Sequence, residues 1–184
     1  MKKIVICISL LSLFVSCSNN EQKEHTSVDA TENSEDARKE DDVASAKKWL
    51  VETIEGFFTN FETLKGDYST ICTKEYAEFK KDATNVDMDG GMSEEAFKTK
   101  WGRRYSQYAG IQEGFLIGGT DNGKIKVSKC ELKNKTEMGG YLFEVVLEDA
   151  DYKSTFYREI VVLPSQDSFL INDVREIKNV FAKE

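Results

Sequence analysis

The chain has 184 residues, with 33 acidic and 25 basic side chains and a formal net charge of −8. Residues 1–16 hold two lysines and no acid, so the rest of the chain is more acidic still. An acidic protein lacks the cationic surface that phosphate neutralisation requires, and no stretch combines Lys and Arg with interleaved aromatic residues, which excludes nucleic acid as a partner. The same charge argues against electrostatic adhesion to anionic lipid.

Residues 1–16 have the features of an export signal. Lys2 and Lys3 form a positive start, and the run Ile4–Val15 is almost wholly apolar. The run is long enough for the core of a signal peptide but shorter than the roughly 20 residues of a membrane-spanning helix. The sequence LFVSC at residues 13–17 resembles the lipobox of bacterial lipoproteins.

The lipobox resemblance implies how the protein is attached. In that family the cysteine after the signal is acylated and becomes the new N-terminus, so acyl chains such as palmitate are expected on Cys17. Several acyl chains hold a protein stably at a bilayer. The resemblance therefore implies a lipid-anchored protein of the cell envelope, either periplasmic or surface-exposed. The alternative is an ordinary signal peptide with an incidental cysteine.

Residues 17–42 are expected to form a disordered acidic linker. Acids and Ser, Thr and Asn dominate this stretch, and Val28 is its only sizeable apolar residue. Such a segment buries too little surface to offset the entropy of the chain. It also holds His25, the only histidine of the protein.

Residues 43–184 are the size of one domain and begin with a long helical pattern. Asp41 or Asp42 is expected to cap this helix and Gly66 to end it. The apolar residues of residues 43–64 recur at three- and four-residue steps and so share one face. They are Val43, Ala46, Leu50, Ile54, Phe57, Phe58, Phe61 and Leu64.

Two shorter helices are expected next. Residues 69–83 show helical spacing of apolar side chains. Ser93 is a predicted N-cap, because Glu94 and Glu95 follow it in the first turn, and this helix is expected to end near Gly110. The apolar positions of the two helices are Ile71, Cys72, Tyr76 and Phe79, and then Phe97, Trp101, Tyr105 and Tyr108.

After Gly110 the pattern changes to that of strands separated by short polar turns. The predicted strands are Gly114–Gly118, Lys124–Asn134, Gly140–Asp149, Ser154–Leu163 and Ser168–Ile177. Short connections favour an antiparallel meander. Helices followed by strands predict an α+β fold in which N-terminal helices pack on a curved antiparallel sheet.

This order of elements resembles the nuclear transport factor 2-like cone, above all in the final strand at residues 168–174. It is similar to small envelope lipoproteins of unknown function in Gram-negative anaerobes. The resemblance implies a sheet that closes against the first helix and leaves a pocket. The residues expected to line that pocket are Phe57, Phe61, Tyr76, Trp101 and Tyr105.

The domain lacks the groups of several common active sites. Without a histidine after residue 25, Ser-His-Asp and Cys-His pairs and His-containing metal sites are excluded, and no cofactor is expected. The resemblance suggests Tyr76, Tyr105 or Asp173 for chemistry, whereas the spacing of the tyrosines is that of core residues and Asp173 could be an exposed strand residue.

Two functions follow from these observations. The first is a non-catalytic module that binds a ligand or an envelope protein. The second is a small hydrolase- or isomerase-like enzyme that uses a carboxylate and a tyrosine in the cone pocket. A buried unpaired carboxylate facing a tyrosine would favour the enzyme, and a filled cone would favour the binding module.

Asp87 and Asp89 invite comparison with a calcium loop. Alternating acids, a glycine turn and a later glutamate share features with such a loop, but a third ligand before the glycine is missing and the glutamate comes too early. The alternative, which we favour, is a turn that leads into a capped helix without a metal.

Cys72 and Cys130 leave two alternatives open. Outside the inner membrane a disulfide between them could persist and would stabilise the fold by up to about 4 kcal/mol through chain entropy. The other alternative is two buried free thiols.

The strands are apolar on both faces, which predicts a covering element. Tyr141, Phe143, Val145 and Leu147 alternate with Leu142 and Val146, and the next strand repeats this pattern. One face meets the helices, and a second apolar face requires a partner or another stretch of the chain. A homodimer through the sheet is one candidate for this cover, and residues 110–123 of the same chain are the other. The charged residues Glu144, Glu148, Arg158 and Glu159 interrupt the patch.

Overall fold

The computed structural model describes residues 32–64, 67–105, 110–112, 114–117 and 122–182, and the side chains of the first helix from Asp41 onward. The elements are the helices α1 (Glu32–Thr59), α2 (Phe61–Leu64), α3 (Lys74–Thr84) and α4 (Glu94–Trp101) and the strands β1 (Ile125–Lys135), β2 (Tyr141–Asp149), β3 (Ser154–Ser165) and β4 (Ser168–Val180). Their order confirms the predicted α+β class. The predicted signal, Cys17 and His25 lie outside the described residues.

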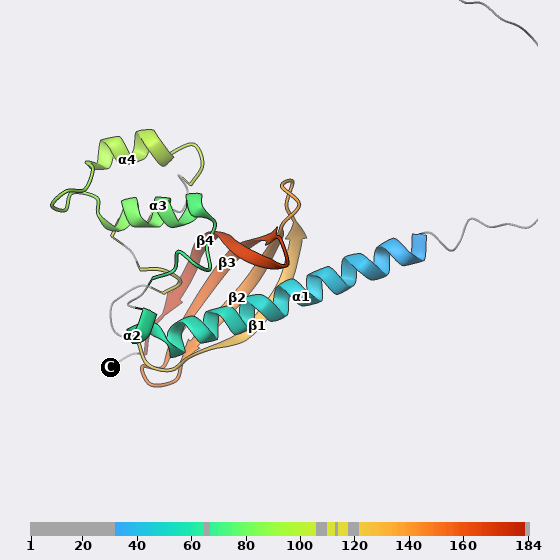
Figure 1. Ribbon diagram of the computed structural model, residues 1–184. Helices are drawn as coiled ribbons and strands as arrows, with labels where there is room; N and C mark the ends of the chain where they lie inside the picture. Colours follow the sequence, from blue (N-terminus) through green and yellow to red (C-terminus); the bar gives the residue numbers. More distant parts are fainter. Residues whose placement is uncertain (1–31, 65–66, 106–109, 113, 118–121, 183–184) are drawn as a thin grey trace, which may run out of the picture.

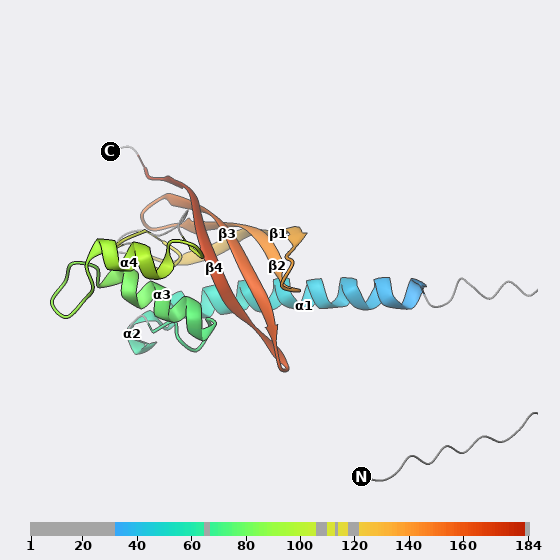
Figure 2. The same cartoon turned by 90° about the horizontal axis from the view of Figure 1, so that it is seen from above.

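The four strands form one antiparallel sheet in the order β1-β2-β3-β4, as the short turns predicted. Helix α1 crosses one face of this sheet and contacts all four strands, while α3 and α4 lie beside the edge formed by β4 (Figures 1 and 2). Among the described residues, no helix has the length and apolar character that crossing a bilayer requires.

Helix α1 begins at Glu32, about ten residues before the predicted caps Asp41 and Asp42. Residues 32–42 were expected to belong to a disordered linker, and this boundary was wrong. The stretch is polar, but Glu, Ala, Arg and Lys dominate its centre, and these residue types have high helix propensity. In Figures 1 and 2 this end of α1 projects beyond the sheet.

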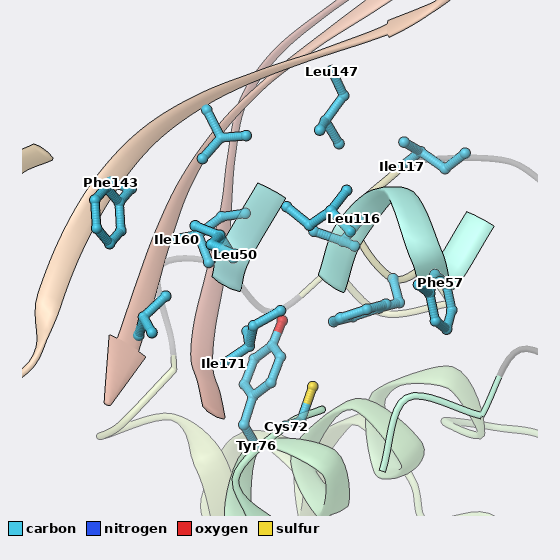
Figure 3. Packing of buried hydrophobic residues seen from close by; sticks show 14 of the residues in the cluster. Leu50, Phe57, Cys72, Tyr76, Leu116, Ile117, Phe143, Leu147, Ile160 and Ile171 are labelled. Carbon is cyan, nitrogen blue, oxygen red and sulfur yellow. The ribbon is translucent and has the colours of Figure 1, made fainter. Parts of the chain in front are cut away.

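The apolar stripe of α1 packs on the sheet as its spacing predicted. Ala46, Leu50 and Ile54 have no exposed surface, and they belong to one cluster with the inward-facing side chains of the strands. Figure 3 shows Leu50 among side chains of the sheet, including Phe143 and Ile160. This burial is the main source of stability for the layer.

Helices α3 and α4 start at side-chain caps. The hydroxyl of Ser93 accepts a hydrogen bond from the Ala96 N–H at 3.3 Å, which confirms the predicted N-cap. Thr73 caps α3 in the same way, so α3 begins at Lys74 rather than at residue 69. Helix α4 ends at Trp101 rather than near Gly110, because Gly102 forms its C-cap.

The described part of the predicted strand Gly114–Gly118, residues 114–117, does not form a strand. Phe115, Leu116 and Ile117 are buried, but Leu116 has a φ of +68°, a left-handed conformation that strands do not adopt. The Leu116 carbonyl accepts a hydrogen bond from Nε of Arg158 at 2.7 Å instead of joining a strand ladder.

The face of the sheet away from α1, called here the open face, is covered by charged side chains. Leu142, Val146 and Val161 point to this face, yet they are only 7%, 8% and 3% exposed. Glu144 and Glu159 are paired across β2 and β3, where like charges repel.

Three cations offset this repulsion. Lys129 contacts Glu144 at 2.8 Å, Lys133 contacts Glu159, and Arg175 lies 3.8 Å from Glu159. These ion pairs lie on the same face of the sheet as Leu142, Val146 and Val161. The homodimer stays a prediction, whereas Arg158, expected among the charges of this patch, is buried on the other face.

We expect Leu50→Ala to lower the free energy of unfolding by about 2–5 kcal/mol, because the residue is fully buried between α1 and the sheet. Lys48→Ala, at an exposed position of the same helix, is the control and should change it by about 0.5 kcal/mol or less. Urea unfolding measures both. Equal effects of the two substitutions would contradict the packing of α1.

Candidate functional site

The residues predicted to line a pocket fall into two aromatic clusters. Tyr76, Trp101 and Tyr105 lie together, with ring centroids 5.7 Å apart for Tyr76 and Tyr105 and 5.9 Å apart for Trp101 and Tyr105. Phe57 and Phe61 lie 5.6 Å apart in another cluster, in which Phe61 is 38% exposed. The five residues therefore do not surround one common cavity.

Among the described residues, side chains of the buried core occupy the space between the sheet and the helices. Figure 3 shows the hydroxyl of Tyr76 directed into the same interior as Leu116 and Ile171. A cavity of about 20 Å³ remains beside Tyr76, which is room for one or two water molecules. Its lining consists of Tyr76, Lys80, Gly114, Leu116, Ile117, Arg158, Val174 and Glu176.

Asp173 of β4 is a buried carboxylate at the border between the sheet and α3. It is 6% exposed, and its Oδ1 atom has no hydrogen-bond partner among the described residues. Its Oδ2 atom accepts a hydrogen bond from Nε of Arg175 at 2.8 Å. The tyrosines Tyr76 and Tyr105, 1% and 3% exposed, lie close enough that the charge of Asp173 acts on both hydroxyls.

Burial shifts the pKa values of Asp173, Tyr76 and Tyr105. Desolvation raises the pKa of Asp173 above its ordinary value, although the Arg175 guanidinium opposes this shift. Burial also raises the pKa of Tyr76 well above 10 and that of Tyr105 to about 12. Both hydroxyls are therefore neutral at physiological pH, and the hydroxyl of Tyr105 has no described hydrogen-bond partner.

The sequence reasoning named all three of these residues and misjudged one of them. Tyr76 and Tyr105 are core residues, as their helical spacing indicated. Asp173 is buried rather than an exposed strand residue. Its position opposite Val161 puts it on the open face of β4, the strand that α3 contacts.

The burial of two cations, Lys80 and Arg158, was not predicted from the sequence. Arg158 is 2% exposed and donates to the carbonyl of Leu116 and, at 2.8 Å, to Oδ1 of Asn179. It also pairs with Glu176 at 3.2 Å. Its place between the inward residues Phe156 and Ile160 was a signal, because alternation puts the side chain of residue 158 on the same face.

Cys72 and Cys130 are buried free thiols, so the disulfide alternative is not the one found. Cys72 precedes α3 and forms an isolated β-bridge with Ile171 of the edge strand β4. Cys130 lies in β1, at the opposite edge of the sheet. Three strand spacings separate these edges by about 14 Å along the sheet, and a disulfide requires Cα atoms within about 7 Å. Burial raises the pKa of both thiols, that of Cys130 to about 11.

The calcium candidates Asp87 and Asp89 are exposed residues of a turn. Asp87 has a φ of +58°, and its N–H donates to the carbonyl of Met92 at 3.0 Å, which closes the turn before α4. In the part of the chain that the structure describes, no three His, Cys, Asp or Glu residues are grouped as metal ligands.

No protein-family model matches this chain, no curated protein matches it, and no solved structure matches it. The candidate site therefore has to be judged from its own geometry. That geometry consists of the buried carboxylate of Asp173, the buried tyrosines Tyr76 and Tyr105, and a cavity beside Tyr76 with room for one or two waters.

We expect Asp173→Asn to raise the melting temperature at pH 8 by a few degrees. The folded pKa of Asp173 is raised, so the folded state holds the proton more readily than the unfolded state, and stability rises as the pH falls through that pKa toward the ordinary value of about 3.9. The neutral amide removes the cost of the buried charge at high pH, and the gain should vanish near pH 4.

Melting curves at several pH values measure this difference. The exposed carboxyl of Asp167, in the turn between β3 and β4, supplies the control variant Asp167→Asn. A destabilised Asp173→Asn protein at pH 8 would show that the ion pair with Arg175 outweighs the burial of the charge.

Proposed function

We propose that this protein is a non-catalytic interaction module of a bacterial cell envelope, held at a membrane by acyl chains on Cys17. The packed interior is the observation that supports the non-catalytic part of this proposal. In the part of the chain that the structure describes, core side chains occupy the interior that would hold a substrate, and the cavity beside Tyr76 has room only for water. Drug-sized ligands occupy cavities of roughly 300–1,000 Å³.

The projecting part of α1 supports a role as a spacer. Residues 32–42 precede Ala46, the first fully buried residue of the helix. Eleven residues of helix span about 16 Å. A lipid on Cys17 would then be joined to the domain by residues 18–31 and a helical stalk, which supports binding of a ligand or an envelope protein away from the bilayer.

The arrangement of elements also supports a nuclear transport factor 2-like fold. A long first helix lies across one face of a four-stranded antiparallel meander, and further helices close the β4 edge. With a filled interior, a partner would bind on the outside. The open face offers a regular surface for this, with Lys129, Lys133, Glu144 and Glu159 as its charged groups.

We expect Cys17→Ser to release the protein from membranes, because serine cannot carry the thioether-linked lipid of the proposed anchor. The measurement is the fraction of protein in the membrane pellet after a salt wash, together with the incorporation of labelled palmitate. Cys7→Ser is the matched control, since Cys7 lies within the apolar run and not at the lipobox position. A Cys17→Ser protein that stays wholly in the membrane fraction would overturn the anchor.

A second function, a small hydrolase- or isomerase-like enzyme, is favoured by one observation. The unpaired Oδ1 of Asp173 and the unpaired hydroxyl of Tyr105 resemble a base and a hydrogen-bond donor. We expect no turnover of small ester and ketone substrates by the full chain. Turnover that both Asp173→Asn and Tyr105→Phe abolish would replace the first proposal with this one.

A further inference from the structure

We propose that residues 115–117 fill an internal binding site for a medium-chain carboxylic acid and leave it when such a ligand binds. The carboxylate of the ligand takes the place of the Leu116 carbonyl on Arg158. Its alkyl chain takes the place of the Leu116 and Ile117 side chains. The inference goes beyond the proposed function, because neither an anchor on Cys17 nor a partner on the open face requires an internal ligand.

Residues 115–117 form a strained turn inside the core. The N–H of Ile117 donates to the Phe115 carbonyl at 2.9 Å, and Leu116 between them has a φ of +68°. Three-residue turns with a positive φ at the centre are rare and strained, and leucine seldom adopts this conformation. The three side chains are nevertheless buried, with at most 9% of their surface exposed. The surrounding structure therefore holds the turn in a conformation that its own residues do not favour.

Arg158 joins this turn to the sheet. Its Nε donates to the Leu116 carbonyl at 2.7 Å. Its Nη1 donates to Oδ1 of Asn179 at 2.8 Å, and its Nη2 pairs with Glu176 at 3.2 Å, both in β4. Because β4 holds the other two nitrogen atoms, Nε keeps its direction when the Leu116 carbonyl leaves. A buried donor that loses its acceptor is costly, so the ligand has to supply an oxygen atom at this position.

The charges beside the turn favour an anionic oxygen atom. The cavity of about 20 Å³ that touches Leu116 and Ile117 is lined by two buried cations, Lys80 and Arg158. Glu176 is the one acid among its described lining residues. Hydrogen bonds between a guanidinium group and a carboxylate are about twice as strong as those between neutral groups. A carboxylate can therefore compete with the peptide carbonyl of Leu116 for Nε of Arg158.

The space that the turn occupies is apolar. Leu116 and Ile117 belong to the same buried cluster as Phe57 and Leu147, and Figure 3 shows them among these side chains. An alkyl chain that replaces the two side chains buries a similar apolar surface, which offsets the cost of moving them. Gly114 directly precedes the turn, and the backbone freedom of glycine permits this segment to change its conformation.

The first test compares octanoate with octanol, which has the same alkyl chain but no carboxylate. Isothermal titration calorimetry with the full chain should show that octanoate binds in the millimolar range or below, severalfold more tightly than octanol. Hydrogen exchange of backbone amides reports on the turn in the same samples. Octanoate should lower the protection of residues 114–117 and leave that of β2 and β3 unchanged.

Two variants test the parts of the site separately. Leu116→Ala should bind octanoate severalfold more tightly than the wild type, because a smaller buried side chain makes the turn easier to displace. Met138→Ala, at a 60% exposed apolar residue of another turn, is the matched control and should bind like the wild type. Arg158→Lys keeps the positive charge but lacks Nε, and it should lose the preference for octanoate over octanol.

Three results would overturn the proposal. They are no binding of octanoate to the wild type in the millimolar range, equal affinities for octanoate and octanol, and octanoate binding that leaves the protection of residues 114–117 unchanged or raised. The last result would place the ligand outside the core. The comparison of the two ligands needs only the wild type, so it decides the question even where Arg158→Lys does not fold.

Discussion

The packing of the α1 stripe on one face of the sheet is the interaction on which the rest of this structure depends. Leu50 and Ile54 are fully buried against strands that come from the last third of the chain. Without this layer the inward side chains of β2 and β3 would face water, because α3 and α4 lie beside the sheet rather than across it. The same packing fills the interior, and so it also limits what the protein can bind there.

Apolar residues are buried on both faces of the sheet, but the groups that accompany them differ between the two faces. The inner face is covered by a helix, whereas the open face carries ion pairs of long charged side chains beside Leu142, Val146 and Val161, which are nevertheless buried. The aliphatic stems of lysine and arginine can cover apolar surface while their charged ends stay in water. Ion pairs at such exposed positions contribute little energy individually.

Two features of the candidate site bear on function, the buried carboxylate of Asp173 and the small cavity beside Tyr76. A buried carboxylate with an unpaired oxygen near tyrosines is typical of a group that binds or moves a proton. The cavity beside Tyr76 has room only for one or two water molecules, and Asp173 is not among the residues that line it.

The sequence by itself determined the elements that local patterns specify. Apolar runs between turn signals located β1 to β4, and alternation located the inward residues of β2 and β3. Three- and four-residue steps located the buried stripe of α1, and Ser93 marked the start of α4. Only the tertiary structure decided the features that depend on distant segments. Residues 114–117 are bent rather than extended because Arg158 binds the Leu116 carbonyl. Cys72 and Cys130 stay apart because β1 and β4 are opposite edges, and Asp173 is buried on β4, the strand that α3 contacts. Periodicity reports which face a residue occupies, but what covers that face depends on segments nearly a hundred residues away in the chain.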